Sequence, residues 1–212
     1  MRIYLLPGIG CDKGLFSRLE LPGHDVTVLE WPPFPKGCTL PGIAQAMAKG
    51  VDASQPHVLV GVSMGGMVAQ ELALLTRPRK VVLISSFTGP AEWPLHARLT
   101  KRFHLWNTVN HFTMWLTWPF KNVLGSRPRD IDRLLWDMAK DQTAGKIRRG
   151  LKAIMHWKGS AWKGPLARIH GDNDHVIPLK FPVDHVIPGG EHIMVLTRAQ
   201  EVSKCLMSAV GQ

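Results

Sequence analysis

Cysteine is scarce in this sequence, and long apolar runs are absent. The chain of 212 residues contains three cysteines, which are Cys11, Cys38 and Cys205. Three widely spaced cysteines exclude a disulfide scaffold and provide no metal-ligand spacing. They favour reduced thiols and therefore a cytoplasmic protein. No stretch reaches the roughly 18 consecutive apolar residues that a membrane-spanning helix requires, so no transmembrane segment is expected.

The sequence also lacks repeats, low-complexity segments and any Ser/Gly-rich linker. Hydrophobic residues make up 45% of the chain and charged residues 20%, which is ordinary globular composition. We therefore expect a single domain spanning residues 1–212. The glycine-rich pieces fit neither a phosphate-binding loop nor a GxGxxG dinucleotide turn, so no cofactor and no metal are predicted.

Acidic residues are too few to balance the basic ones. The chain has 26 Lys and Arg against 16 Asp and Glu, a formal net charge of +10. Residues 95–158 alone hold 13 of these cations and four Asp. Such a balance favours an anionic partner or a solvated basic face. Without a recognisable binding motif, nucleic acid is not expected, whereas peripheral contact with an anionic membrane remains open.

Short apolar runs alternate with helical patterns along most of the chain. The sequence predicts strands at residues 2–6, 24–30, 57–62, 80–85, 166–170 and 184–187. Helices are predicted near residues 13–19, 39–49, 64–75 and 199–210. This alternation is typical of an α/β fold with a doubly wound, all-parallel six-stranded sheet.

A long insertion, residues 87–163, separates the fourth and fifth predicted strands. It holds seven of the eight tryptophans. Apolar residues recur at helical spacing at positions 105, 109, 112 and 116, and again at 131, 134, 135 and 138. Structureless loops of this length are rare in compact domains, so the insertion is predicted to be a helical cap.

The motif Gly61-Val62-Ser63-Met64-Gly65 follows an apolar strand and precedes a helix. A turn this tight leaves no room for side chains at Gly61 and Gly65, and it pushes the serine out over the carboxyl edge of the sheet. The neighbouring helix N-terminus favours developing negative charge. We predict that Ser63 is a nucleophile; the alternative is a turn serine without chemistry.

A serine nucleophile needs a base, and the base needs an orienting acid. Asp172 and Asp174 follow the fifth predicted strand, and His192 follows the sixth. These segments lie at the carboxyl ends of parallel strands, where ligands bind in open α/β sheets. Both carboxylates are candidates for the acid. His170 and His175, which flank them, are expected to be structural.

With these motifs the sequence resembles the α/β-hydrolase superfamily over nearly its whole length. The matching pieces are PGIG at 7–10, GVSMGG at 61–66, HGDNDHVIP at 170–178 and GGEH at 189–192. The resemblance implies that Asp174 is the acid, with Asp172 as its hydrogen-bonding neighbour, and that His192 is the base. It also implies an oxyanion hole formed by the backbone N–H groups of Ile9 and Met64.

One position departs from the family pattern. Most relatives carry His where this chain has Pro7, a difference that affects the support and hence the geometry of the loop that contains Ile9. Because the donor is a backbone group, the chemistry does not require that histidine.

The resemblance implies a serine hydrolase that cleaves a carboxylic ester or thioester through an acyl-enzyme. A small-molecule substrate with an apolar acyl group is expected, because residues 103–120 are uncharged and rich in bulky apolar side chains. Cations at 98, 101, 102, 121, 127 and 129 flank that stretch. Two other readings remain open, since a fold does not fix chemistry. One is an acyltransferase, perhydrolase or lyase on the same fold, and the other is a binding protein with a vestigial triad.

Overall fold

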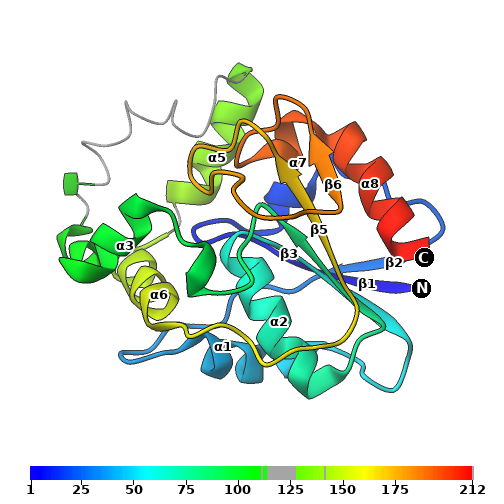
Figure 1. Ribbon diagram of the computed structural model, residues 1–212, viewed down its shortest axis with the longest axis horizontal. Coiled ribbons are helices and arrows are strands. Elements are labelled where there is room, and N and C mark those ends of the chain that lie inside the picture. Colours follow the sequence, from blue (N-terminus) through cyan, green and yellow to red (C-terminus); the bar gives the residue numbers. More distant parts are fainter. Residues whose placement is uncertain (111, 114–127, 141, 212) are drawn as a thin grey trace.

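The computed structural model describes residues 1–110, 112–113, 128–140 and 142–211. A six-stranded sheet with the order β2-β1-β3-β4-β5-β6 forms its centre, and every pairing is parallel (Figure 1). The strands are β1 (Arg2–Leu6), β2 (Asp25–Val28), β3 (His57–Val62), β4 (Lys80–Ile84), β5 (Leu166–Gly171) and β6 (His185–Ile187). The predicted α/β fold with six parallel strands is confirmed. The second strand is shorter than the predicted 24–30.

Burial explains the order of the strands. All six residues of β3 are buried, as expected for a strand covered on both faces. The edge strand β2 exposes its first three residues. Because β1 pairs with β2 on one side and β3 on the other, the chain reverses its winding direction there. Loops that follow β1 and β3 therefore flank a crevice at the carboxyl edge of the sheet.

Helices cover both faces of the sheet. Helices α1 (Leu40–Met47) and α2 (Met64–Thr76) pack on one face, and α7 (Met194–Thr197) and α8 (Ala199–Gly211) pack on the other (Figure 1). Thr39 caps α1 by accepting a hydrogen bond from the N–H of Gly42 at 3.1 Å, and a 3₁₀ turn, η2 (Ala48–Gly50), follows α1. The helix predicted near residues 13–19 is only a 3₁₀ turn, η1 (Lys13–Phe16).

The insertion between β4 and β5 is helical but does not form one layer. It contains η3 (Pro90–Glu92), α3 (Leu95–Arg102), η4 (Leu105–Thr108), α5 (Arg129–Lys140) and α6 (Ala144–His156). Helices α3 and α6 pack together on the α2 side of the sheet, whereas α5 packs against η1 on the other side. No helix in the described ranges is long and apolar enough to cross a membrane.

The spacing of apolar residues predicted helix α5 correctly, but the beginning of the helix expected from position 105 was wrong. The residues at 131, 134, 135 and 138 lie on α5 as predicted. The first part of the helix predicted over 105–116 is instead the short turn η4, and the backbone is extended at Val109. Asn110 and Thr113 exchange hydrogen bonds in the pattern of a new helix start, which ends the previous turn. Position 116 lies outside the described residues.

Candidate active site

Ser63 lies in the tight turn between β3 and α2, with φ 54° and ψ −121°. A positive φ is strained for a residue with a side chain, so neighbouring packing must hold it. A Cβ added at Gly61 would lie 2.3 Å from the backbone of Gly65, and one added at Gly65 would lie 2.2 Å from the carbonyl oxygen of Leu6. The backbone itself therefore requires glycine at both positions.

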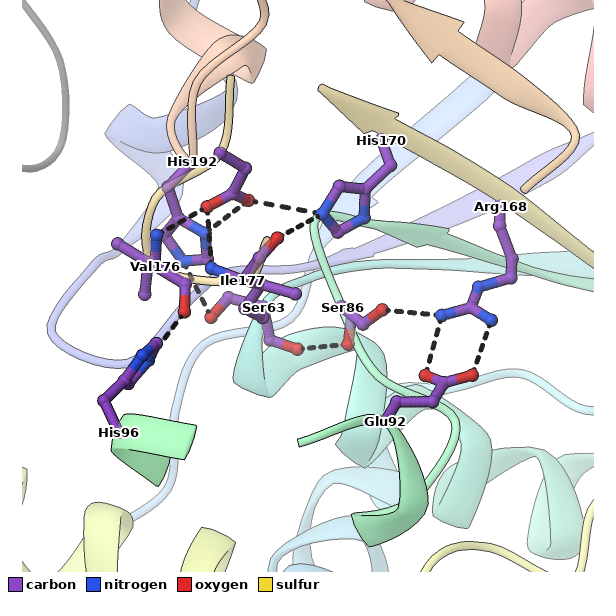
Figure 2. A network of polar contacts seen from close by, with 10 residues as sticks. Ser63, Ser86, Glu92, His96, Arg168, His170, Val176, Ile177 and His192 are labelled. Atoms are coloured by element: carbon purple, nitrogen blue, oxygen red, sulfur yellow. Dashed lines mark hydrogen bonds and ion pairs between the residues drawn. The ribbon is translucent and has the colours of Figure 1, made fainter. Parts of the chain in front are cut away.

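His192 connects Ser63 to Asp174 (Figure 2). Its Nε2 lies 3.1 Å from the Oγ of Ser63, and its Nδ1 lies 2.9 Å from Oδ2 of Asp174. Since an ionised carboxylate only accepts hydrogen bonds, Nδ1–H donates to Asp174 and leaves Nε2 to accept from the serine hydroxyl. Asp174 and His192 are buried, and Ser63 is half-buried. The structure brings all three predicted residues together.

Asp174 is held as a carboxylate by several donors. Its Oδ1 accepts hydrogen bonds from the N–H groups of Val176 at 2.9 Å and Ile177 at 2.8 Å. Burial raises the pKa of Asp174, but the hydrogen bonds from His170 and His192, the charge of His192 and the N–H of Ile177 outweigh it. The pKa therefore lies well below its usual range. Asp174 can orient His192 without taking its proton.

Asp172 and the two neighbouring histidines lie outside the hydrogen-bonded series of Ser63, His192 and Asp174. Asp172 is exposed and accepts a hydrogen bond from the N–H of Gly189 at 2.7 Å, which clamps the loop after β6. His170 is buried, and its Nε2 donates to the carbonyl of Ile177 at 2.8 Å while lying 3.5 Å from Oδ2 of Asp174. His175 is exposed. Of the two candidate acids, only Asp174 contacts His192.

Of the two predicted oxyanion donors, Met64 follows Ser63 in the chain, and Ile9 lines the same cavity as Ser63. Met64 is the first residue of α2, where backbone N–H groups lack intrahelical partners. Ile9 belongs to the loop after β1, and a Cβ added at Gly8 would lie 3.6 Å from the Cβ of Ser63. The support that Pro7 cannot give comes from Trp31, which donates a hydrogen bond to the carbonyl of Gly8 at 3.1 Å. Nothing in the sequence singled out Trp31.

A cavity of about 350 Å³ lies beside Ser63 and His192. Helix α3 lines it with His96, Ala97 and Thr100, and helix α6 lines it with Leu151, Ile154 and Met155. His96 also donates a hydrogen bond from Nε2 to the carbonyl of Val176 at 3.0 Å, which ties α3 to the loop of Asp174 (Figure 2). The lining is mainly apolar, so the cavity suits a hydrocarbon group.

The apolar wall predicted over residues 103–120 does not line this cavity in its described part. Trp106 is buried between His104 and His156, with which it makes edge-to-face contacts. Phe103 and Phe112 are exposed. Residues 114–120 lie outside the described part of the chain. In the described part of this stretch, Trp106 therefore packs within the insertion, and side chains of α3 and α6 line the cavity.

Cys11 also lines the cavity and is a possible competing nucleophile. Burial and the nearby charge of Asp12 raise the pKa of its thiol to about 12. A protonated thiol is a poor nucleophile, so Ser63 with its hydrogen-bonded base is the better candidate. Among the described residues, no three His, Cys, Asp or Glu side chains are grouped to hold a metal ion.

An ion pair near the site, between buried Arg168 and half-buried Glu92, was not foreseen from the sequence. Arg168 of β5 makes two parallel contacts with Glu92 of η3, Nη1 to Oε1 at 2.7 Å and Nη2 to Oε2 at 2.8 Å. Its Nη2 also donates to the carbonyl of Ser86 at 3.2 Å, and the hydroxyl of Ser86 donates to the carbonyl of Ser63 at 2.6 Å (Figure 2). The available signal in the sequence was an arginine between two apolar residues of β5, Ala167 and Ile169.

The sequence is similar to those of known proteins. A family model described as alpha/beta hydrolase family matches residues 3–204. The chain is 26% identical over 200 residues to the pimeloyl-[acyl-carrier protein] methyl ester esterase of Hamiltonella defensa subsp. Acyrthosiphon pisum (strain 5AT), covering 83% of this chain and 71% of that protein.

Solved structures of esterases are similar in fold. One is the esterase from Exiguobacterium antarcticum, with a TM-score of 0.78 at 15% identity, covering 100% of this chain and 92% of the other. Another is a thermophilic esterase from Thermogutta terrifontis, with a TM-score of 0.79 at 18% identity, covering 99% and 89%.

Proposed function

We propose that this chain, which belongs to the alpha/beta hydrolase family, hydrolyses carboxylic esters through a covalent intermediate on Ser63. His192 acts as the general base and Asp174 orients it. The observation that supports this most directly is the hydrogen-bonded series from Ser63 through His192 to Asp174, which borders an apolar cavity. Thioesters are chemically equivalent substrates for the same groups.

The first half of the reaction acylates the serine. Oγ of Ser63 attacks the carbonyl carbon while Nε2 of His192 takes its proton, which forms a tetrahedral oxyanion and an imidazolium. The N–H groups of Ile9 and Met64 stabilise the negative charge on the oxygen. The imidazolium then protonates the leaving alcohol or thiol as its bond to the carbonyl carbon breaks, and the acyl group remains on Ser63.

The second half returns the enzyme to its starting state. Neutral His192 takes a proton from water, and the resulting hydroxide attacks the acyl carbon through a second oxyanion. Collapse breaks the bond to Oγ, and the imidazolium returns the proton to Ser63. The acid product leaves the cavity. Asp174 remains ionised throughout, because its pKa lies well below its usual range.

The relative from Hamiltonella defensa suggests a second form of substrate, an ester carried on an acyl carrier protein. Helices α3 and α6, which line the cavity, carry the exposed cations Arg98, Lys101, Arg102, Arg148 and Lys152 and no acidic residue. A cationic surface beside the cavity suits an acidic carrier. A higher kcat/KM for the carrier-bound ester than for the free ester, with the advantage lost at high salt, is the expected result.

The decisive test of the proposed function is the variant Ser63→Ala, assayed on p-nitrophenyl esters of graded chain length. Removal of the nucleophile is expected to lower kcat by at least about 10³-fold, with the melting temperature little changed. The control is Ser54→Ala, because Ser54 is exposed. Wild-type turnover by Ser63→Ala would contradict the proposal.

Labelling and product analysis separate the two other readings. A fluorophosphonate should label folded wild-type protein and not Ser63→Ala. If the chain were a binding protein with a vestigial triad, the reagent would label neither the wild type nor the variant. If added alcohols or peroxide compete strongly with water for the acyl group, the activity is that of an acyltransferase or perhydrolase.

A further inference from the structure

We propose that Ser86, fixed by the Arg168–Glu92 ion pair, is a positioning residue that holds Ser63 in its reactive conformation. This inference rests on the proposed function, because it concerns the same nucleophile. The side chain of Ser86 donates a hydrogen bond to the backbone carbonyl of Ser63, so its effect on the reaction is indirect.

Ser63 needs external support because its backbone has a positive φ. Its N–H donates to the carbonyl of Ile84 at 3.0 Å, which ties it to β4. Its carbonyl accepts from the N–H of Gly66 at 3.0 Å and from the hydroxyl of Ser86 at 2.6 Å. The hydroxyl of Ser86 is thus the side-chain donor that fixes the orientation of this peptide group.

Ser86 is held closely in turn. It is buried and follows Ser85, which also has a positive φ of 47°, so the chain turns sharply where β4 ends. A Cβ added at Gly66 would lie 2.5 Å from the Oγ of Ser86, which shows how closely the first turn of α2 packs on this hydroxyl. Gly66, beyond the GxSxG motif, therefore makes room for Ser86.

The carbonyl of Ser86 accepts a hydrogen bond from the Nη2 of Arg168. The guanidinium lies over the ring of Phe181, 4.0 Å from its centroid, and binds both carboxylate oxygens of Glu92. Glu92 also accepts hydrogen bonds from the N–H and hydroxyl of Thr88. Residues 86, 88 and 92 are thereby fixed to one guanidinium–carboxylate pair at the junction between β4 and the insertion.

The charge of this pair is maintained in the folded protein. Burial raises the pKa of Glu92, but the hydrogen bonds from Arg168 and Thr88 and the charge of Arg168 lower it further than burial raises it. Because hydrophobic residues often replace buried ion pairs without loss of stability, stability alone is a weak reason for such a pair. Its directional contacts fix geometry, and a 1 Å displacement of a reacting group can cost about 100-fold in rate.

The test compares Ser86→Ala with a matched variant, Thr76→Val. Both remove one buried hydroxyl, but Thr76 lies at the far end of α2, where it donates to the carbonyl of Leu72. Activity is measured well below the melting temperature of each variant. Ser86→Ala is expected to lower kcat about 10- to 100-fold with KM nearly unchanged, and to slow fluorophosphonate labelling of Ser63 by the same factor. Thr76→Val should leave both rates within about twofold of wild type.

A second variant, Arg168→Lys, tests whether the ion pair acts through Ser86. Lysine keeps the charge but cannot bind Glu92 and the carbonyl of Ser86 with a planar fork. Its loss in kcat should not add to that of Ser86→Ala in the double variant. Should Ser86→Ala fail to fold, Arg168→Lys alone must lower kcat without raising KM.

The outcomes distinguish this inference from the proposed function. If Ser63→Ala abolishes turnover while Ser86→Ala and Arg168→Lys keep wild-type kcat and labelling rates, only the positioning role is wrong. An equal loss of kcat in Thr76→Val and Ser86→Ala would show that the effect comes from a general loss of stability, and this result would also overturn the positioning role. Turnover by Ser63→Ala would instead remove the proposed function.

Discussion

The turn between β3 and α2 and the helix α6 both border the cavity, yet they differ in how strictly their sequences are fixed. In the turn, added Cβ atoms at Gly61 and Gly65 would overlap backbone atoms at 2.2–2.3 Å. In α6, a Cβ at Gly145 would meet only the flexible side chain of Arg149 at 3.2 Å. The turn is determined by backbone contacts that cannot move, and α6 by side chains that can.

This difference predicts which substitutions should alter the reaction rate and which should alter substrate selectivity. Changes in the turn and its partners should affect folding or kcat for every substrate. Changes on the cavity face of α6 should affect only substrates that reach that far. The four predictions below test this division, beginning with the largest expected effect.

Exchanging glycine for alanine in each region is the most direct comparison. Gly65→Ala places a Cβ 2.2 Å from the carbonyl oxygen of Leu6 and 2.4 Å from that of Pro7, so we expect a loss of more than about 4 kcal/mol in the free energy of unfolding. Gly145→Ala, within α6, should gain up to about 1 kcal/mol. Urea denaturation measures both. Equal tolerance of the two substitutions would break the comparison.

The acid that orients His192 gives the next largest effect. Asp174→Asn should lower kcat about 10³- to 10⁴-fold, because the amide favours the wrong imidazole tautomer. Asp172→Asn, which alters only the contact with Gly189, should stay within a few fold of wild type. Similar losses in both variants would move the acid role away from Asp174.

The ion pair that joins the sheet to the insertion should make stability depend on pH. The pKa of Glu92 is lower in the folded state than its ordinary value of 4.5. Its ionised form therefore stabilises the fold above about pH 4.5, and this contribution is lost as the pH falls through the lower folded pKa. Glu92→Gln should cost about 3 kcal/mol at pH 7, with a difference from wild type that narrows on acidification.

The control for this prediction is Asp130→Asn, which breaks the exposed pair between Arg18 and Asp130. Exposed pairs contribute little, so its melting temperature should follow that of wild type across the same pH range. If the melting temperature of Glu92→Gln depended on pH in the same way as that of Asp130→Asn, the pair between Arg168 and Glu92 would not specifically stabilise the junction between the sheet and the insertion.

The smallest effect is a change in selectivity from α6. Leu151→Trp adds bulk to the cavity wall, so kcat/KM for a long-chain p-nitrophenyl ester should fall about tenfold while that for the acetyl ester is kept. Lys152→Gln is the control, since Lys152 is exposed on the same helix. If kcat/KM fell equally for all acyl chain lengths, α6 would affect the reaction in the same way as the turn, and the proposed difference between the two regions would be wrong.

Much of the sheet and of the candidate site followed from the sequence because both obey short-range rules. Apolar runs and turn residues located the strands to within a few positions. Steric limits made the glycines around Ser63 recognisable, and the resemblance to a family indicated Asp174 and His192. Such features depend on neighbours in the chain or on the ends of strands.

The residues that support the site could not be predicted from the sequence, because each acts through a contact between residues that are distant in the chain. Trp31 bonds to Gly8, Ser86 bonds to Ser63, and Arg168 bonds to Glu92 from 76 positions away. No local pattern marks such pairs. The first part of the helix expected from position 105 was wrong for a different reason, since the extended backbone at Val109 and the hydrogen bonds between Asn110 and Thr113 interrupt it.

The parallel sheet has a consequence for how activity is gained during folding. Parallel neighbours cannot form as hairpins, so every pairing requires closure of a long loop before it yields stabilising contacts. Ser63 and His192, which lie 129 positions apart, meet only after β3 and the loop following β6 are both in place. In a refolding experiment, helical signal should return early and esterase activity late, so that recovered activity reports completion of the contact between Ser63 and His192.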